Sequence, residues 1–223
     1  MTTTDKARIS ELLREVPAGQ LRVTQDDMVQ DEPLGAEGKG CSEVFPLFDG
    51  VAIAFHRYLT QTASAHHHDA ASALEVNYCH CGRLAWHMRE DRVVYMGGGD
   101  ASVQTMDDCA DSSMDMPLGY FEGATVSIDL DALCHAPQTM CQALGLSPNL
   151  LRENVEALCH PAVLLSCAPL QRIFSDLFEM PQEQLLPYCR LRVLELLLWL
   201  QGAGLAAVPL PELYQAEQLD IIR

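Results

Sequence analysis

The chain has 223 residues, 48% of them hydrophobic, and a formal net charge of −17 that comes from 31 acidic and 14 basic side chains. These proportions exclude an intrinsically disordered chain and favour one large globular domain or two modest ones. A surface so acidic repels phosphate backbones, so this chain alone is not expected to bind DNA.

The sequence shows no signal for export or for membrane insertion. The N-terminus lacks a basic segment followed by an apolar one, and the longest apolar run, near residues 194–200, is far too short to span a bilayer. The nine cysteines occur singly, which favours reduced thiols over a disulfide framework. We therefore expect a cytoplasmic protein without a membrane partner.

The first predicted element is an amphipathic helix over residues 5–16, where apolar residues recur at helical spacing: Ile9, Leu12, Leu13 and Val16. It is expected on the outside of the β-rich part. A short strand at 20–25 and an acidic loop with glycine and proline at 30–40 follow. Residues 43–48 and 51–60 then predict a hairpin, because Asp49-Gly50 is a strong turn signal.

The stretch that organises the chain runs from Leu74 to Asp107, after a polar connection at 61–71. It contains three β-prone runs separated by Gly82-Arg83, Asp91-Arg92 and a triple glycine at 97–99, which predicts a meander. Its first run alternates between two faces, with Leu74, Val76 and Tyr78 on one and Glu75, Asn77 and Cys79 on the other. A strand in a small barrel has two different faces: one packs against other elements, and the other faces an interior that can hold a ligand.

After this stretch we expect an acidic loop at 107–116 and a last strand at 123–130. The signals then become helical, with helices predicted at 137–144, 148–157, 169–180, 181–201 and 211–223. The expected division is a barrel with its N-terminal helix over 1–132 and a helical module over 133–223.

Several short motifs resemble one family. They are Leu74-Glu-Val-Asn-Tyr-Cys79 followed by Gly82-Arg83, then Gly98-Gly99-Asp100, and Met116-Pro-Leu-Gly-Tyr-Phe-Glu-Gly123 before a strand that ends in Ile128-Asp129. In this order they are similar to the N-terminal effector-binding and dimerisation half of AraC-family transcriptional regulators. The resemblance covers roughly residues 20–223.

The resemblance implies an α+β fold, a cupin-like β-barrel followed by a C-terminal helical module. It also implies a role in transcription regulation, in which a small organic effector bound in the barrel acts through an attached DNA-binding domain. In that family, two helix-turn-helix units follow a helix like 211–223, and this sequence does not contain them. The chain is therefore expected to be either a truncated form or a sensor without its output domain, which reaches DNA only through a domain not present here.

The candidate ligand-binding residues are polar or amphipathic groups on the predicted strands and beside them: His56, Asn77, Trp86, His87, Tyr95 and Tyr120. Alternatively, several of them merely pack against neighbouring helices, and about half are expected to face the interior. No nucleophile with an adjacent base, no phosphate loop and no spaced carboxylate pair is recognisable. We therefore predict neither enzymatic activity nor catalytic residues.

A metal site is the alternative reading, because His66, His67, His68, Cys79, His80 and Cys81 offer imidazole and thiolate ligands. Such a site would make the protein a metal-dependent cupin enzyme or a His/Cys metal sensor. The spacing lacks the His-x-His-then-Glu pattern that metal-using cupins share. We expect no metal and no cofactor, with the histidines in a solvent-facing loop and the thiols buried as small hydrophobes.

The leucine-rich helix around residues 189–201 is apolar on more than one side. Leu191, Leu194 and Leu198 form one stripe, and a second stripe consists of Val193, Leu196, Leu197 and Leu200. One stripe can pack on the barrel, and we predict that Leu191, Leu194 and Leu198 form a homodimer interface. The alternative is a core helix covered on both sides within one chain.

Overall fold

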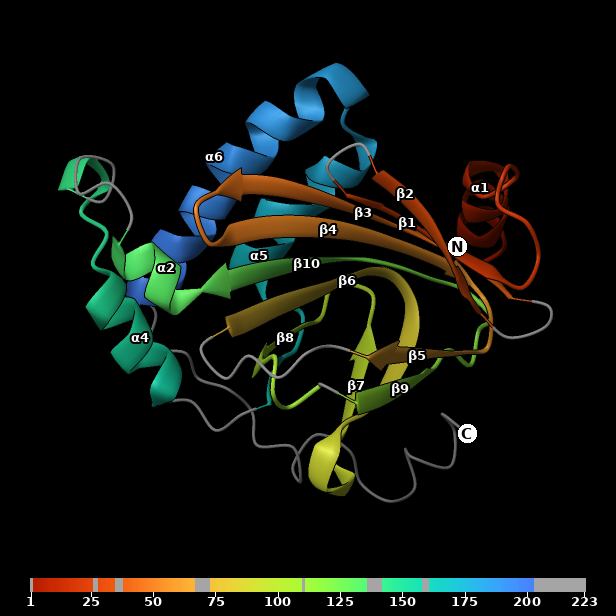
Figure 1. The fold of residues 1–223 in the computed structure, drawn as a ribbon, viewed down its shortest axis with the longest axis horizontal. Coiled ribbons are helices and arrows are strands. Elements are labelled where there is room, and N and C mark those ends of the chain that lie inside the picture. Colours follow the sequence, from red (N-terminus) through yellow and green to blue (C-terminus); the bar gives the residue numbers. More distant parts are fainter. Residues whose placement is uncertain are drawn as a thin grey trace.

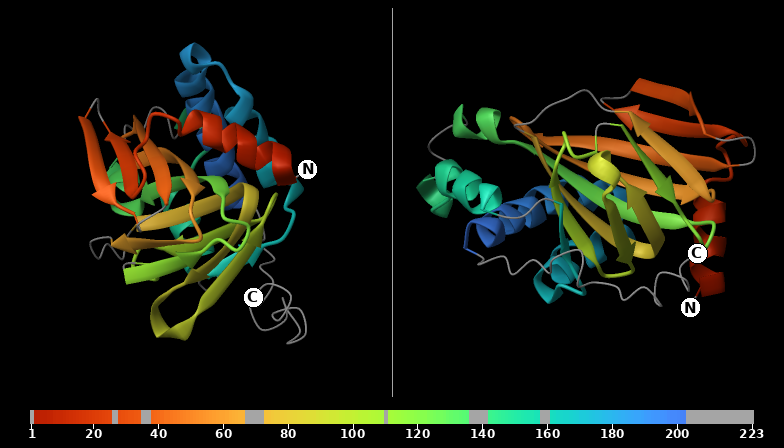
Figure 2. Two further views of the ribbon diagram at one scale, coloured as in Figure 1. Left: turned by 90° about the vertical axis from the view of Figure 1, so that its right-hand side faces the viewer. Right: turned by 90° about the horizontal axis from the view of Figure 1, so that it is seen from below.

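The computed structural model describes residues 2–25, 28–34, 38–66, 73–109, 111–135, 142–157 and 161–202. Its strands curl into an open barrel, with α6 along one side, α1 at one end, and α2 and α4 at the other end (Figures 1 and 2). The predicted class, α+β with a β-barrel followed by helices, is confirmed.

The barrel consists of two sheets that share one long strand. The larger sheet has the order β11(Ala162–Leu164), β8(Ala101–Thr105), β6(Ala73–His87), β10(Phe121–Asp129), β4(Val51–Leu59), β3(Lys39–Phe48), β1(Gln20–Gln25) and β2(Met28–Pro33). The smaller sheet contains β5(Thr62–His66), β9(Asp111–Asp115), β6 and β7(Val93–Gly97). All these pairings are antiparallel except that of β1 with β3.

The predicted meander was wrong about the shared strand β6, which the sequence divided into two runs at Gly82-Arg83. Its first half pairs with β8 and β10, and its second half pairs with β7 and β9. Gly82 therefore marks a bend within one strand and does not separate two strands. The bend requires glycine, because φ is +98° and a Cβ at this position would lie 2.6 Å from the carbonyl oxygen of Tyr120.

Several other strand predictions were wrong because the strands concerned are short and polar. β2 overlaps the start of the predicted loop at 30–40, β9 lies within the predicted loop at 107–116, and β5 lies within the predicted connection at 61–71. They are held by backbone hydrogen bonds to neighbouring strands, which local sequence does not reveal. The strand at 20–25, the hairpin at Asp49-Gly50 and the strand at 123–130 are confirmed. That strand is not the last one, however, because β11 lies within the predicted helical module and pairs with β8.

The helices after the barrel are α2(Leu130–His135), α4(Pro148–Glu156), α5(Ala168–Phe174), the 3₁₀ helix η2(Ser175–Glu179) and α6(Gln182–Gly202). The predicted helix at 169–180 is thus divided between α5 and η2, and those at 148–157 and 181–201 are α4 and α6. Most of the helix predicted at 137–144 and all of the one at 211–223 lie outside the described residues. No helix in the described ranges is long and apolar enough to cross a membrane.

The main core lies between the larger sheet and α5, η2 and α6. The ring of Tyr78 on β6 stacks on that of Phe174, with ring centroids 5.0 Å apart, and Phe55 on β4 meets the ring of Phe178 edge-on at 5.4 Å. Val193, Leu196 and other buried residues of α6 belong to the same cluster. Burying a side chain of this size stabilises the fold by about 1.5–3 kcal/mol, so the helices are part of the structure that holds the sheet in shape.

The helix α1(Thr2–Leu12) and the turn after it pack on the outside of the barrel, as expected. Ile9, Leu13 and Val16 form a small core with Tyr120, whereas Leu12 is 51% exposed and not part of it. Beneath α1 lies a buried ionic cluster. The carboxylate of Glu122 is fully buried and contacts both Arg8 and Arg57, and Arg57 also donates to Glu43 at 2.6 Å.

Candidate functional site

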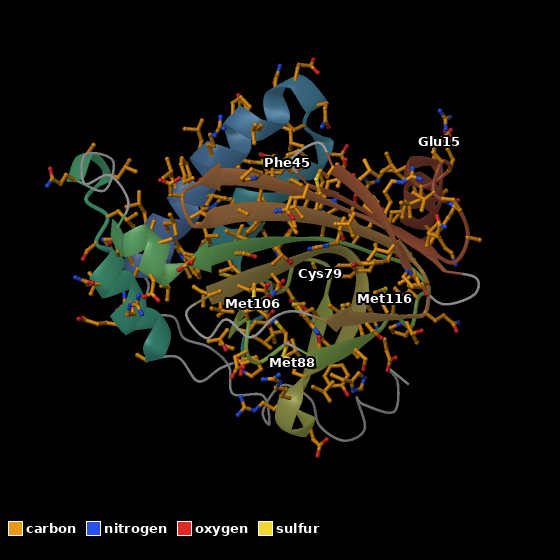
Figure 3. The ribbon with its side chains drawn as sticks, viewed as in Figure 1. Glu15, Phe45, Cys79, Met88, Met106 and Met116 are labelled. Carbon is orange, nitrogen blue, oxygen red and sulfur yellow. The ribbon has the colours of Figure 1, made fainter. Side chains whose placement is uncertain are left out.

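A cavity of about 920 Å³ lies in the interior of the barrel. Strands of both sheets contribute to its walls, including β1, β3, β4, β5, β6, β7, β9 and β10. Met106 lines the cavity and lies nearer one end of the barrel than Cys79, a buried residue of β6 (Figure 3). The volume falls within the range of sites that hold small molecules.

Of the predicted ligand-binding residues, His56, Asn77 and Trp86 line this cavity. His56 and Asn77 lie on the faces of β4 and β6 that point inward. The opposite faces of the same strands carry Phe55 and Tyr78, which pack against the helices. Trp86 follows the bend in β6, and its indole Nε1 donates a hydrogen bond to Ser112 Oγ at 2.8 Å.

The structure does not bring His87, Tyr95 and Tyr120 to the cavity, and strand parity is the reason for the first two. His87 follows the inward-facing Trp86, and its Nε2 lies 2.9 Å from Asp115 Oδ2 in a half-exposed pair. Tyr95 lies between Val94 and Met96, which both belong to the interior cluster. Tyr120 precedes β10 and packs under α1.

One wall of the cavity carries a continuous chain of polar contacts across four strands, β3, β4, β10 and β6. Ser42 Oγ lies 2.8 Å from His56 Nδ1, His56 Nε2 lies 3.1 Å from Thr125 Oγ1, and Thr125 Oγ1 donates to Asn77 Oδ1 at 2.6 Å. Ser42 is directly opposite His56, and Thr125 is directly opposite Asn77, in the register of the sheet. Direct cross-strand pairs place side chains close enough for such bonds.

The same wall carries a buried carboxylate. Glu75 lies two residues before Asn77 on the same face of β6, and its Oε2 accepts a hydrogen bond from Cys109 Sγ at 3.3 Å. Burial and the neighbouring Glu75 raise the pKa of the Cys109 thiol, so this thiol stays protonated and can donate. A cavity that combines apolar lining with a few placed polar groups can orient a small molecule.

Sequence reasoning missed Ser42, Glu75 and Thr125 as residues of this wall. Glu75 was placed on the polar face of its strand, and Thr125 and Ser127 alternate with apolar residues in the same way. This alternation was the signal that could have identified them. The alternation does not show how the strands pair, and this register decides which polar residues become neighbours.

The described residues contain no group of three or more His, Cys, Asp or Glu side chains placed to hold a metal ion. A β-bulge separates Cys79 from Cys81: Cys79 belongs to the interior cluster and Cys81 packs beside α1. His80 lies outside the barrel and stacks on Phe178, with ring centroids 4.1 Å apart. These residues therefore do not share a face, and His67 and His68 lie outside the described ranges.

Of the six thiols that the structure describes, three are buried and three are partly buried. Burial, together with the nearby Glu122, raises the pKa of Cys81 to about 12, and burial raises that of Cys189 to about 12. A thiol with such a pKa is protonated at neutral pH and is a poor nucleophile and metal ligand.

The two stripes of α6 have different surroundings. Val193, Leu196, Leu197 and Leu200 are fully buried against the barrel side of the helix. In the stripe predicted to form a dimer interface, Leu191 is 62% exposed and Leu198 is 36% exposed, while Leu194 is partly buried at the edge of the core.

No protein-family model matches the chain, and no curated protein matches it. Among solved structures, an HTH_3-family transcriptional regulator from Vibrio cholerae overlaps 40% of this chain and 50% of its own length, at 11% identity and a TM-score of 0.35. This chain thus spans about half of that regulator. The Cupin_2 domain of an XRE-family transcriptional regulator from Enterobacter cloacae overlaps 40% of this chain and 95% of its own, at 6% identity and a TM-score of 0.34. An RmlC-like cupin protein from Desulfovibrio desulfuricans overlaps 40% and 80%, at 12% identity and a TM-score of 0.33. Overlaps of this size and identity transfer no function to this chain.

Proposed function

We propose that the chain is the ligand-sensing and dimerisation region of an AraC-type transcriptional regulator, and that it binds a small organic effector in the barrel. The observation that carries the proposal is the interior cavity of about 920 Å³ with one polar wall. The AraC assignment itself depends on the sequence motifs around Cys79, Asp100 and Gly123.

The position of the cavity suits a sensor. Its walls are the inner faces of the same strands whose outer faces hold α5, η2 and α6. A ligand that binds one arrangement of barrel and helices more tightly shifts the population toward that arrangement by its differential affinity. The helix predicted at 211–223 would pass this shift to a DNA-binding domain outside these residues.

A thermal-shift screen of small organic molecules tests the sensor proposal. A ligand at a hundredfold excess over its Kd stabilises the native state by about 2.7 kcal/mol. For a chain of this length that raises Tm by roughly 5–10 °C.

The cavity is tested with one variant and one matched control. Ala54 lines the cavity with a small side chain, so Ala54→Leu fills part of the space without removing packing and should abolish the shift. His87→Ala changes the outer face next to Trp86 and should leave the shift intact. The cavity is not the sensor site if the screen finds no ligand, or if the ligands that it finds raise the Tm of the Ala54→Leu variant as much as that of the wild-type chain.

We also propose that the chain forms a homodimer through the exposed stripe of α6. Leu191 and Leu198 remain exposed although they lie on a helix whose other side is buried, and Tyr188 on the same helix is 42% exposed. Exposed apolar residues grouped along one helix are typical of an interface between subunits.

Light scattering tests the dimer. Leu191→Glu and Leu198→Glu should convert a dimer to a monomer, because each would bury a charge in the interface. Leu118→Glu is the matched control, since Leu118 is 37% exposed but lies in the turn before β10. A wild-type chain that is monomeric, or equal effects of all three changes, would place the interface elsewhere.

A further inference from the structure

The polar chain on the cavity wall has a defined direction. Thr125 Oγ1 donates its one proton to the amide oxygen of Asn77, so it can only accept from His56. His56 must therefore carry its proton on Nε2, which leaves Nδ1 as the acceptor of a hydrogen bond from Ser42. Each group in the chain donates toward Asn77.

This direction fixes how Asn77 faces the cavity. Its Oδ1 is engaged by Thr125, and its Nδ2 is buried without a hydrogen-bond partner among the described residues. The residue as a whole is only 5% exposed. Buried amide groups in native proteins are almost always satisfied, so an unsatisfied N–H donor on a cavity wall indicates an acceptor supplied by a ligand.

Glu75 provides the complementary group. It lies two residues before Asn77, a spacing of roughly 6.8 Å along one face of a strand, and it also lines the cavity. A carboxylate has several acceptor positions, so beyond its contact with Cys109 it can accept from a ligand N–H. No lysine or arginine occurs among the described residues that line the cavity, so a negatively charged head group would meet the Glu75 carboxylate and none of these cationic side chains.

The remainder of the cavity suits an apolar body. Leu84, Trp86, Met96, Met114 and Phe121 line it, and methionines adapt readily to ligands of different shapes. A molecule that fits this wall and this interior has a hydrophobic body, one hydrogen-bond acceptor, one N–H donor and no negative charge.

We infer that the cavity selects ligands with an uncharged amide-type head group, whose carbonyl accepts from Asn77 Nδ2 and whose N–H donates to Glu75. This inference rests on the proposed function, since it names the chemical class of the effector. It excludes carboxylates and phosphates, because these groups also offer a hydrogen-bond acceptor but bring a negative charge next to the Glu75 carboxylate.

Three probes with the same body test the inference: naphthylacetamide, naphthylacetate and ethylnaphthalene, measured by calorimetry on the full chain. The amide should bind at least about tenfold more tightly than either of the others, because one well-placed hydrogen bond in a buried site is equivalent to about 1.4 kcal/mol. Equal binding of the amide and the hydrocarbon, or tighter binding of the carboxylate, would overturn the inference.

Two variants separate the roles of the two residues. Asn77→Ala should reduce the preference of the amide over ethylnaphthalene, because alanine has no side-chain donor for the ligand carbonyl. Glu75→Gln keeps the shape and removes the charge, so it should narrow the gap between amide and carboxylate by about tenfold. If either variant folds poorly, the ranking of the three probes on the wild-type chain still decides the question.

The test also distinguishes this inference from the proposed function. If none of the three probes binds, the amide assignment is wrong, whereas the sensor proposal fails only if the wider screen also yields no ligand that depends on Ala54. If ligands bind but show no preference for the head group, the sensor proposal stands and the inference fails.

Discussion

Replacing Glu122 with alanine tests whether the ionic cluster under α1 holds the N-terminal helix on the barrel. The carboxylate of Glu122 is fully buried, and its partners Arg8 and Arg57 are 31% and 16% exposed. Breaking a buried ion pair by removing one partner costs about 3–5 kcal/mol, because the remaining charge stays buried. Here Arg57 keeps its contact with Glu43 and Arg8 can turn to solvent, so we expect the lower end, roughly 3 kcal/mol.

The measurement is urea denaturation followed by circular dichroism, in which the free energy of unfolding is compared at equal m values. Glu11→Ala is the matched control, since Glu11 pairs with Arg14 at 2.8 Å on the same segment but both side chains are largely exposed. That change should stay within about 0.5 kcal/mol. If Glu122→Ala costs no more than Glu11→Ala, the cluster does not stabilise the fold and the reasoning from burial is wrong.

Two further changes probe β6. Gly82→Ala should destabilise the protein by more than Gly145→Ala in the same urea assay: both glycines have positive φ, but only Gly82 has backbone atoms within 3 Å of the added Cβ. Similar losses of stability in the two variants would mean that the positive φ alone, and not the close backbone contact at Gly82, determines the cost. Burial lowers the pKa of His80 in the native state. As the pH falls through about 6.5, the unfolded chain therefore binds a proton at His80 that the native state does not bind. The free energy of unfolding consequently decreases below that pH. His80→Gln should make the stability curve flatter between pH 7 and 5, and an unchanged slope would contradict this.

The strands that the sequence predicted well are those with one apolar and one polar face. β4, the first half of β6 and β10 bury Phe55, Tyr78 and Val126 against the helices and turn His56, Asn77 and Thr125 toward the cavity. Burial on one side and polar contacts on the other leave a period-2 pattern that can be read directly. β9, with the sequence Asp-Ser-Ser-Met-Asp, has no such pattern and was predicted as a loop.

The candidate site was predictable only in part, because its geometry depends on register. Asn77 could be placed on the polar face of its strand, but its partner Thr125 lies 48 residues later in the chain. Likewise, the bulge that turns Cys81 away from Cys79 arises opposite Glu122 and Gly123 on another strand. Local pattern gives the face of a residue, and long-range pairing gives its neighbours.

The alternation of β6 also determines how a ligand could influence the helices. Asn77 faces the cavity, and the next residue, Tyr78, stacks on Phe174 of α5 on the other side of the sheet. A ligand that pulls the Asn77 amide inward acts on the backbone that carries Tyr78, so the cavity and the helical core are one residue apart along the strand. Close packing resists gradual deformation, so a shift at Asn77 reaches α5 only if the Tyr78 and Phe174 rings have a second stable arrangement. A ligand that binds both arrangements equally would occupy the cavity and leave the helices unchanged.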